Sequence, residues 1–238
     1  MAFKNVLDES IRSLVEALGK DLHSIYLYGS VGRGTATFGE SDLDLSVIVY
    51  SKLSIEVKEK LEQIEEQVSK RNDAISKLEF DIGTFDEAMI RNEFAWQFFL
   101  KHLCCCVWGE DLRGRIAPYK PSLKIGLEMN KDIGVRLTKT RKCLTDTNFR
   151  TQGRAIAKKI LRTHYSILSE RDNSWYESLS DIAECIKHYE PDLSQKIDLS
   201  LRIALGSASS TDEVMTLLEE YGSLVVTRFT QSGGFVLT

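Results

Sequence analysis

Hydrophobic positions recur with two different periods along the chain, and the change near residue 116 divides it into two parts. Before that point, segments with an apolar residue every three or four positions alternate with segments in which every second residue is apolar. The helical segments are 6–18, 57–68 and 94–100, and the strand-like segments are 24–28, 43–49, 78–82 and 104–108. This alternation predicts a layered arrangement of helices and strands.

Two of these strands carry an expectation about burial. In 43–49, polar residues alternate with leucine and valine, which predicts a half-buried strand. In 104–108, three consecutive cysteines lead into Val107 and Trp108, which predicts a buried strand where cysteine acts as a small apolar residue. The five cysteines are odd in number and form no C-x-x-C pair, so neither a disulfide framework nor a zinc site is indicated.

Beyond Pro118 and Pro121 the strand signal largely disappears. Helical periodicity is carried by residues 125–143, 153–170, 175–188, 195–204 and 212–221. These segments predict a bundle of about four or five helices. Residues 224–238 are expected to form a terminal strand or a loose end. The sequence therefore predicts two domains, residues 1–118 and 119–238.

The formal net charge of −4 hides an uneven distribution. Residues 1–120 have a net charge of −5 and residues 121–238 a net charge of +1, while 124–162 alone has +8. This basic stretch would complement phosphate groups. No apolar run reaches the length of a membrane span, and the N-terminal residues do not resemble a secretory signal. We expect a cytoplasmic protein without a membrane partner.

A glycine-rich turn follows the strand 24–28. Gly29 ends this strand and Ser30 begins a helical turn, where backbone N–H groups favour an anion. The side chains of Ser30 and Arg33 would add hydrogen-bond donors, and Gly32 and Gly34 would let a ligand approach the backbone. The turn therefore predicts a phosphate-binding site.

Paired carboxylates occur on the next two strands. Asp42 and Asp44 are two residues apart, so they share one face of a strand with Cα atoms about 7 Å apart. The two carboxylates of such a pair repel each other, so they add little to the stability of the fold. Together they can hold Mg²⁺, which takes oxygen ligands and leaves coordination positions for substrate phosphates. Glu79 and Asp81 share a face of the following strand, and one of them would complete the metal site or act as general base.

The run from Gly29 to Leu45 resembles the signature of the DNA polymerase β-like nucleotidyltransferase superfamily, in particular the bacterial minimal and antibiotic nucleotidyltransferases. The resemblance implies an α+β fold. An N-terminal nucleotidyltransferase domain with a mixed β-sheet flanked by helices would be followed by a C-terminal α-helical bundle. The bundle would complete the cleft for nucleotide and acceptor.

The resemblance also implies roles for the polar residues. Ser30 would contact the nucleotide phosphates, Asp42 and Asp44 would bind Mg²⁺, and Asp81 would be the third carboxylate, serving as metal ligand and general base. Glu79 is the alternative base, because the Leu-Glu pair at this position is similar to the Leu-Glu of some streptomycin adenylyltransferases.

Residues 153–170 are similar to the helical domain of many antibiotic nucleotidyltransferases, in which a lysine reaches the triphosphate. Lys158 is the candidate for this contact, followed by Lys159 and Arg162. The alternative is a solvated basic helix face with no role in binding.

The implied activity is transfer of a nucleoside monophosphate, AMP from ATP or from another nucleoside triphosphate, to a hydroxyl group with release of pyrophosphate. An aminoglycoside-like antibiotic or another small molecule is the favoured acceptor, which implies a role in antibiotic resistance. A tRNA or a protein partner, as in toxin–antitoxin pairs, is an alternative acceptor. The non-enzyme alternative is a nucleotide-binding module with a decayed site.

Overall fold

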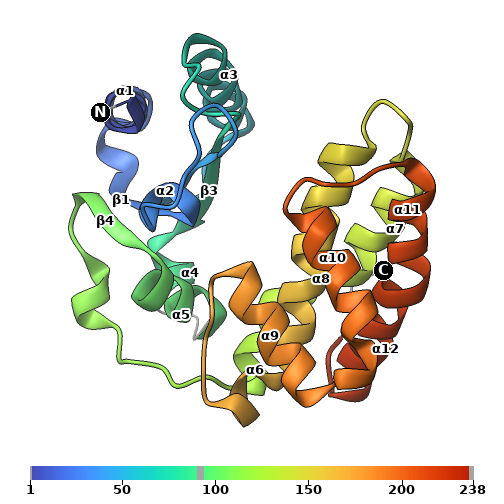
Figure 1. The fold of residues 1–238 in the computed structure, drawn as a ribbon. Coiled ribbons are helices and arrows are strands. Elements are labelled where there is room, and N and C mark those ends of the chain that lie inside the picture. The colour runs from blue at the N-terminus through green and yellow to red at the C-terminus, as the bar shows by residue number, and fades with distance from the viewer. Residues whose placement is uncertain (1, 90–93, 236–238) are drawn as a thin grey trace. The chain divides into compact units, whose positions relative to one another are not determined.

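A four-stranded mixed sheet organises the first of two units, residues 1–119, in a computed structural model that describes residues 2–89 and 94–235 (Figure 1). The strands are β1 (Leu22–Tyr28), β2 (Leu43–Val49), β3 (Leu78–Thr84) and β4 (Cys105–Gly109). Their order is β3-β2-β1-β4, with β1 antiparallel to both neighbours and β2 parallel to β3. The mixed sheet expected from the resemblance is confirmed.

Helices cover both faces of this sheet. They are α1 (Ala2–Leu18), α2 (Gly29–Gly32), α3 (Ile55–Arg71), α4 (Phe85–Met89) and α5 (Phe94–Leu103), with 3₁₀ turns at Gly19–Asp21 and Leu112–Arg115. The buried residues of α1 and α3 pack on the face that carries Leu43, Leu45 and Val47. Those of α4 and α5 pack with Tyr26 and Ile48 on the opposite face. In Figure 1, α1 and α3 lie on one side of the strands and α4 and α5 on the other.

The expectation of a half-buried strand at 43–49 was wrong. Strand β2 is buried along both faces, and Ser46 and Ile48 on the supposedly polar face are fully inaccessible. The reason is tertiary: α4 and α5 cover this face, which the alternation within β2 does not reveal. Only Asp44, near the start of the strand, stays partly exposed.

The expectation of a buried strand at 104–108 was also wrong. Strand β4 lies at the edge of the sheet, and both of its ends, Cys105 and Gly109, are exposed. Cys104 is buried, but it precedes the strand. An edge strand has a neighbour on one side only, so a short apolar run there does not imply burial.

The second unit, residues 120–238, is helical. Its helices are α6 (Leu123–Asn130), α7 (Ile133–Cys143), α8 (Phe149–Asp172), α9 (Leu179–Tyr189), α10 (Ser194–Ala204), α11 (Thr211–Thr216) and α12 (Ser223–Gln231), with a 3₁₀ turn at Pro191–Leu193 and a π-helical stretch at Leu217–Gly222. Helix α8 is central, because α6, α7, α9, α10 and α12 all pack against it. In the part of the chain that the structure describes, no helix is both long and apolar enough to cross a membrane.

Two expectations for this unit need correction. Residues 125–143 form two helices, because the chain turns between α6 and α7, where the Lys159 ammonium donates to the carbonyl of Met129 and pairs with Asp132. Residues 224–231 belong to α12 and form neither a strand nor a loose end, since Val225 and Phe229 lie one helical turn apart and are both fully buried. The final residues of that segment, 236–238, lie outside the described residues.

The buried Tyr26 hydroxyl fastens the segment that follows β4. It accepts a hydrogen bond from Leu112 N at 2.8 Å and donates one to the carbonyl oxygen of Glu110 at 3.4 Å. Tyr26→Phe leaves the buried Leu112 N–H without its acceptor. We expect the free energy of unfolding, measured with urea, to fall by about 1–3 kcal/mol, and amide hydrogen exchange at Leu112 to accelerate.

The control is Tyr50→Phe, since the Tyr50 side chain is exposed and removal of its hydroxyl leaves no buried group unpaired. Unchanged exchange at Leu112 in Tyr26→Phe would contradict this account of the anchor.

Candidate active site

The predicted carboxylates lie where three strands of the sheet end or begin. Because β1 is antiparallel to β2 and β2 is parallel to β3, the last residue of β1 and the first residues of β2 and β3 meet at one end of the sheet. Asp44 is the Cα partner of Tyr28 on one side and of Glu79 on the other. Asp81 is the partner of the buried Ser46, two residues further along the same face. Register thus brings Glu79 beside Asp44 and sets Asp81 deeper in the sheet.

Gly29 and Asp44 approach each other closely. Gly29 has φ of +69°, and a Cβ atom built on it would lie 2.0 Å from Asp44 Oδ2. A side chain at position 29 would therefore fill the space that the carboxylate of Asp44 occupies. This approach ties the metal-binding candidate to the turn predicted to bind phosphate.

That turn is the four-residue helix α2. Arg33 N donates to the carbonyl of Gly29 at 3.2 Å, and Thr35 N donates to the carbonyl of Ser30 at 2.9 Å. The first N–H groups of a helix have no acceptor within it, so they are available to an anion. Ser30 is half-buried and Arg33 is exposed at the end of the turn. The structure therefore gathers Gly29, Ser30 and Arg33 on one loop next to Asp44.

Asp42 is held by a loop that the sequence motif does not contain. The Ser76 hydroxyl donates to Asp42 Oδ1, and Ser76 N donates to the carbonyl of Ser41 at 3.0 Å. Leu43 N donates to the carbonyl of Lys77 at 2.8 Å. Residues 76 and 77 thereby fasten the chain on both sides of Asp42. Ser76 was missed at the level of sequence because nothing local connects it to a position 34 residues earlier.

Repulsion between carboxylates shapes the electrostatics of this face. Burial raises the pKa of Asp81, and the neighbouring charge of Glu79 raises it further. Burial also raises the pKa of Tyr28, with added contributions from Asp44, Asp81 and Glu79. The Tyr28 phenol is therefore neutral at physiological pH and lies within the field of all three carboxylates. Such a face gains stability from any cation that it binds.

Lys77 places a cation on this face. Lys77 forms an ion pair with Glu79, and this hydrogen bond is the largest cause of the raised pKa of Lys77. Glu65 and Asp42 raise it further through their charges. The sequence offered no signal for Lys77, because a lysine two residues before a strand carboxylate is common on protein surfaces.

The donor set fits Mg²⁺ better than a transition metal. The candidate ligands Asp42, Asp44, Glu79 and Asp81 are all carboxylates, which magnesium prefers. Among the residues that the structure describes, no three His, Cys, Asp or Glu side chains already converge as a metal cage. Magnesium is commonly held by one or two carboxylates together with substrate phosphates, so a closed protein cage is not required. The Asp44 carboxylate over Gly29 supplies such a partial site.

The other predicted residues belong to α8 in the second unit. Lys158 is half-buried and Arg162 is exposed. Lys159 lies between them but is committed to the bundle: its ammonium is 2.6 Å from Asp132 Oδ1, and burial lowers its pKa. Lys159 is thereby a structural residue of the α6–α7 turn.

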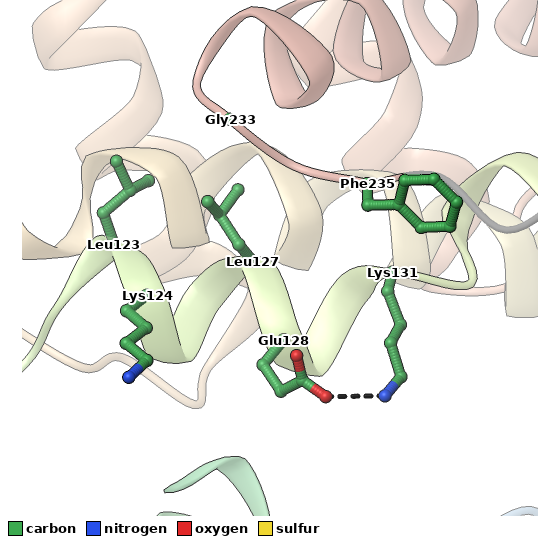
Figure 2. A pocket seen from close by; sticks show the side chains of 7 residues that line it. All are labelled: Leu123, Lys124, Leu127, Glu128, Lys131, Gly233 and Phe235. Carbon is green, nitrogen blue, oxygen red and sulfur yellow. Dashed lines mark hydrogen bonds and ion pairs between the residues drawn. The ribbon is translucent and has the colours of Figure 1, made fainter.

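A surface pocket of about 470 Å³ lies on the second unit, between α6 and the segment after α12 (Figure 2). Its lining consists of Leu123, Lys124, Leu127, Glu128, Lys131, Gly233 and Phe235. The single carboxylate in this lining, Glu128, pairs with Lys131 at 2.6 Å. The pocket therefore contains none of the residues predicted to carry the chemistry.

Comparison with known proteins identifies the domain to which these residues belong. Residues 8–96 match the family model of the nucleotidyltransferase domain, and this range includes α2, Asp42, Asp44, Glu79 and Asp81. The first unit therefore contains a nucleotidyltransferase domain, as the resemblance implied, and the protein is a nucleotidyltransferase. A search of curated proteins found no match.

Among solved structures, the chain is similar to spectinomycin adenyltransferase AAD(9) from Enterococcus faecialis, determined with ATP and spectinomycin. The two share 14% sequence identity with a TM-score of 0.67, and the match covers 95% of this chain and 99% of the other. The similarity establishes that both units share its fold, which confirms the predicted α+β architecture with a helical C-terminal region.

Comparing Gly29→Ala with Gly34→Ala separates two contributions to the loss of stability, backbone strain at a left-handed glycine and a collision with Asp44. Both glycines have left-handed φ angles, +69° and +72°, so each substitution should cost about 1–2 kcal/mol of the free energy of unfolding. A Cβ at Gly34 meets no atom within 4 Å, whereas one at Gly29 collides with Asp44. We expect Gly29→Ala to lose more than Gly34→Ala in urea unfolding. Equal losses would contradict the close approach.

Proposed function

We propose that the protein transfers AMP from ATP, with Mg²⁺, to a hydroxyl group of a small aminoglycoside-like molecule and releases pyrophosphate. The observation that carries this proposal is the contact of Asp44 with the Gly29 turn, with Glu79 next to Asp44 in the sheet. It joins a carboxylate that suits magnesium to a turn that suits phosphate. The fold shared with an adenyltransferase whose structure contains ATP and spectinomycin supports the choice of donor and acceptor class.

In this mechanism the acceptor hydroxyl oxygen attacks the α-phosphorus in line with the bond to the departing pyrophosphate. The new bond joins the acceptor oxygen to the α-phosphorus, the bond from the α-phosphorus to the bridging oxygen breaks, and the hydroxyl proton passes to a carboxylate of the protein. Asp42 and Asp44 would hold Mg²⁺, which when bound neutralises charge that develops on the phosphate oxygens. Ser30 and the N–H groups of α2 would orient the phosphates, with Arg33 at the end of that turn.

We propose Glu79, rather than Asp81, as the carboxylate that accepts the proton. Glu79 is the Cα partner of Asp44, so the two residues lie at the same position along their strands and on the same face of the sheet. Asp81 lies two residues further along β3, away from this end of the sheet and beside Ser46, and burial there raises its pKa. A base must come within hydrogen-bond distance of the proton that it removes, and this favours the residue nearer the end of the sheet.

Contacts of Lys158 and Arg162 with the triphosphate stay predictions from the resemblance. Both belong to α8, and the ion pair of Lys159 with Asp132 favours them over Lys159 for this role. The acidic character of residues 1–120 supports a cationic small molecule as acceptor in preference to tRNA, because a polyanion would be repelled.

Incubation with α-labelled ATP tests the function directly. Separate reactions contain aminoglycosides, lincosamides, tRNA or proteins of a cell lysate, and we expect label in the small-molecule pool only when Mg²⁺ is present. Asp44→Asn should reduce the rate by about 100-fold or more, because the carboxylate that holds the metal is neutralised. Asp212→Asn, an exposed carboxylate on α11, is the matched control.

Each other outcome has a defined meaning. Label in tRNA or in a protein would assign the acceptor to that class and contradict the small-molecule proposal. Label in no pool, with ATP binding intact, would indicate a nucleotide-binding module without transferase activity.

Glu79→Gln and Asp81→Asn distinguish the two carboxylates. If Glu79 removes the hydroxyl proton, Glu79→Gln should lower kcat by about 100-fold or more, within the usual contribution of a general base. Asp81→Asn should lower kcat by less than about tenfold, since this residue would act only through its charge. Single-turnover rates with saturating ATP provide the measurement, and the reverse ranking would assign the base to Asp81.

A further inference from the structure

Lys77 is held in position beside the carboxylates by the sheet itself. Its carbonyl oxygen accepts the hydrogen bond from Leu43 N at 2.8 Å, and Leu43 lies between Asp42 and Asp44. Its side chain pairs with Glu79, the register partner of Asp44. The backbone of Lys77 thus lies beside the metal-binding candidates, and its ammonium contacts the proposed base.

The carboxylates of this face need a counter-charge when no metal is bound. Asp44 and Glu79 are register partners on two adjacent strands, Asp81 lies two residues further along β3, and Asp42 directly precedes β2. Like charges placed in this way destabilise the fold unless a cation offsets them. Lys77 supplies such a cation, and the charges of Glu79, Glu65 and Asp42 all act on its ammonium. The pair is partly exposed, with 58% of the Lys77 side chain and 47% of the Glu79 side chain accessible, so it can separate at low cost.

We propose that Lys77 is a positioning residue that holds Glu79 in the metal-free protein and competes with the bound divalent cation for that carboxylate. This inference rests on the proposed function. As the site is loaded, Glu79 exchanges its bond to the Lys77 ammonium for the field of the metal and becomes available to the acceptor hydroxyl. Lys77 thereby lowers the affinity of the empty site for metal and keeps the metal-free carboxylates from repelling one another.

Binding of Mn²⁺ alone, followed by electron paramagnetic resonance, tests the competition without relying on activity. In Lys77→Met, no ion pair with Glu79 has to break when the metal binds. We therefore expect Mn²⁺ to bind about two- to fivefold more tightly, a change that fits the loss of a partly exposed ion pair. Lys77→Arg keeps the charge and should match the wild type. Lys70→Met is the matched control, because Lys70 forms a similar exposed pair with Glu66 on α3.

A double-mutant cycle shows whether Lys77 acts through Glu79. Adding Lys77→Met to Glu79→Gln should change Mn²⁺ affinity by less than about 1.5-fold, because the partner of the lysine is already neutral. An equal gain in both backgrounds would contradict the proposal and indicate a general effect of charge. Unchanged Mn²⁺ affinity together with weaker ATP binding would overturn it in favour of a lysine that contacts the triphosphate.

Failure of the proposed function gives a different result. If the wild type binds no Mn²⁺, or binds it as well after Asp44→Asn, the metal site itself is wrong and the role of Lys77 falls with it. If the wild type binds Mn²⁺ through Asp44 and Lys77→Met binds it equally well, the metal site stands and only the competition is refuted.

Discussion

The close approach of Asp44 to Gly29 is the constraint on which the rest of the site depends. A left-handed glycine at the end of β1 lets the chain turn into α2 while leaving room for a carboxylate where a side chain would otherwise lie. The antiparallel pairing of β1 with β2 brings these two residues together. The turn predicted to bind phosphate and the carboxylate predicted to bind metal are thus parts of one local arrangement.

Accumulated negative charge is the second constraint on this arrangement. Asp44 lies at the partly exposed start of β2, whose remaining length is buried between two layers of helices, and Glu79 and Asp81 lie in the partly exposed middle of β3. The sheet supplies rigidity at the cost of burial and mutual repulsion: burial raises the pKa values of Asp81 and Tyr28, and the neighbouring carboxylates raise them further. Lys77 offsets part of this repulsion, which makes it a component of the site although it lies outside the recognisable motif.

Much of the fold could be predicted because its elements have strong local patterns. Strand β2 and helix α1 end where their apolar periods end, and the run from Gly29 to Asp44 carries the family signature. Burial was less predictable. Strand β2 is covered on both faces and β4 lies at an edge, and each outcome depends on which segments pack nearby. The helix α12 was missed because its short apolar pattern lies next to glycines.

The sequence by itself determined the class of protein, the division into a layered half and a helical half, and the candidate residues for the chemistry. Tertiary structure decided which acidic residue lies beside Asp44, because alternation assigns a side chain to a face but does not identify its neighbour on the next strand. It also placed Ser76 and Lys77 against this site and assigned Lys159 to the bundle. The contacts of Ser76 with Asp42, of the Lys77 carbonyl with Leu43 N and of Lys159 with Asp132 join residues far apart in the chain, and a local period contains no information about them.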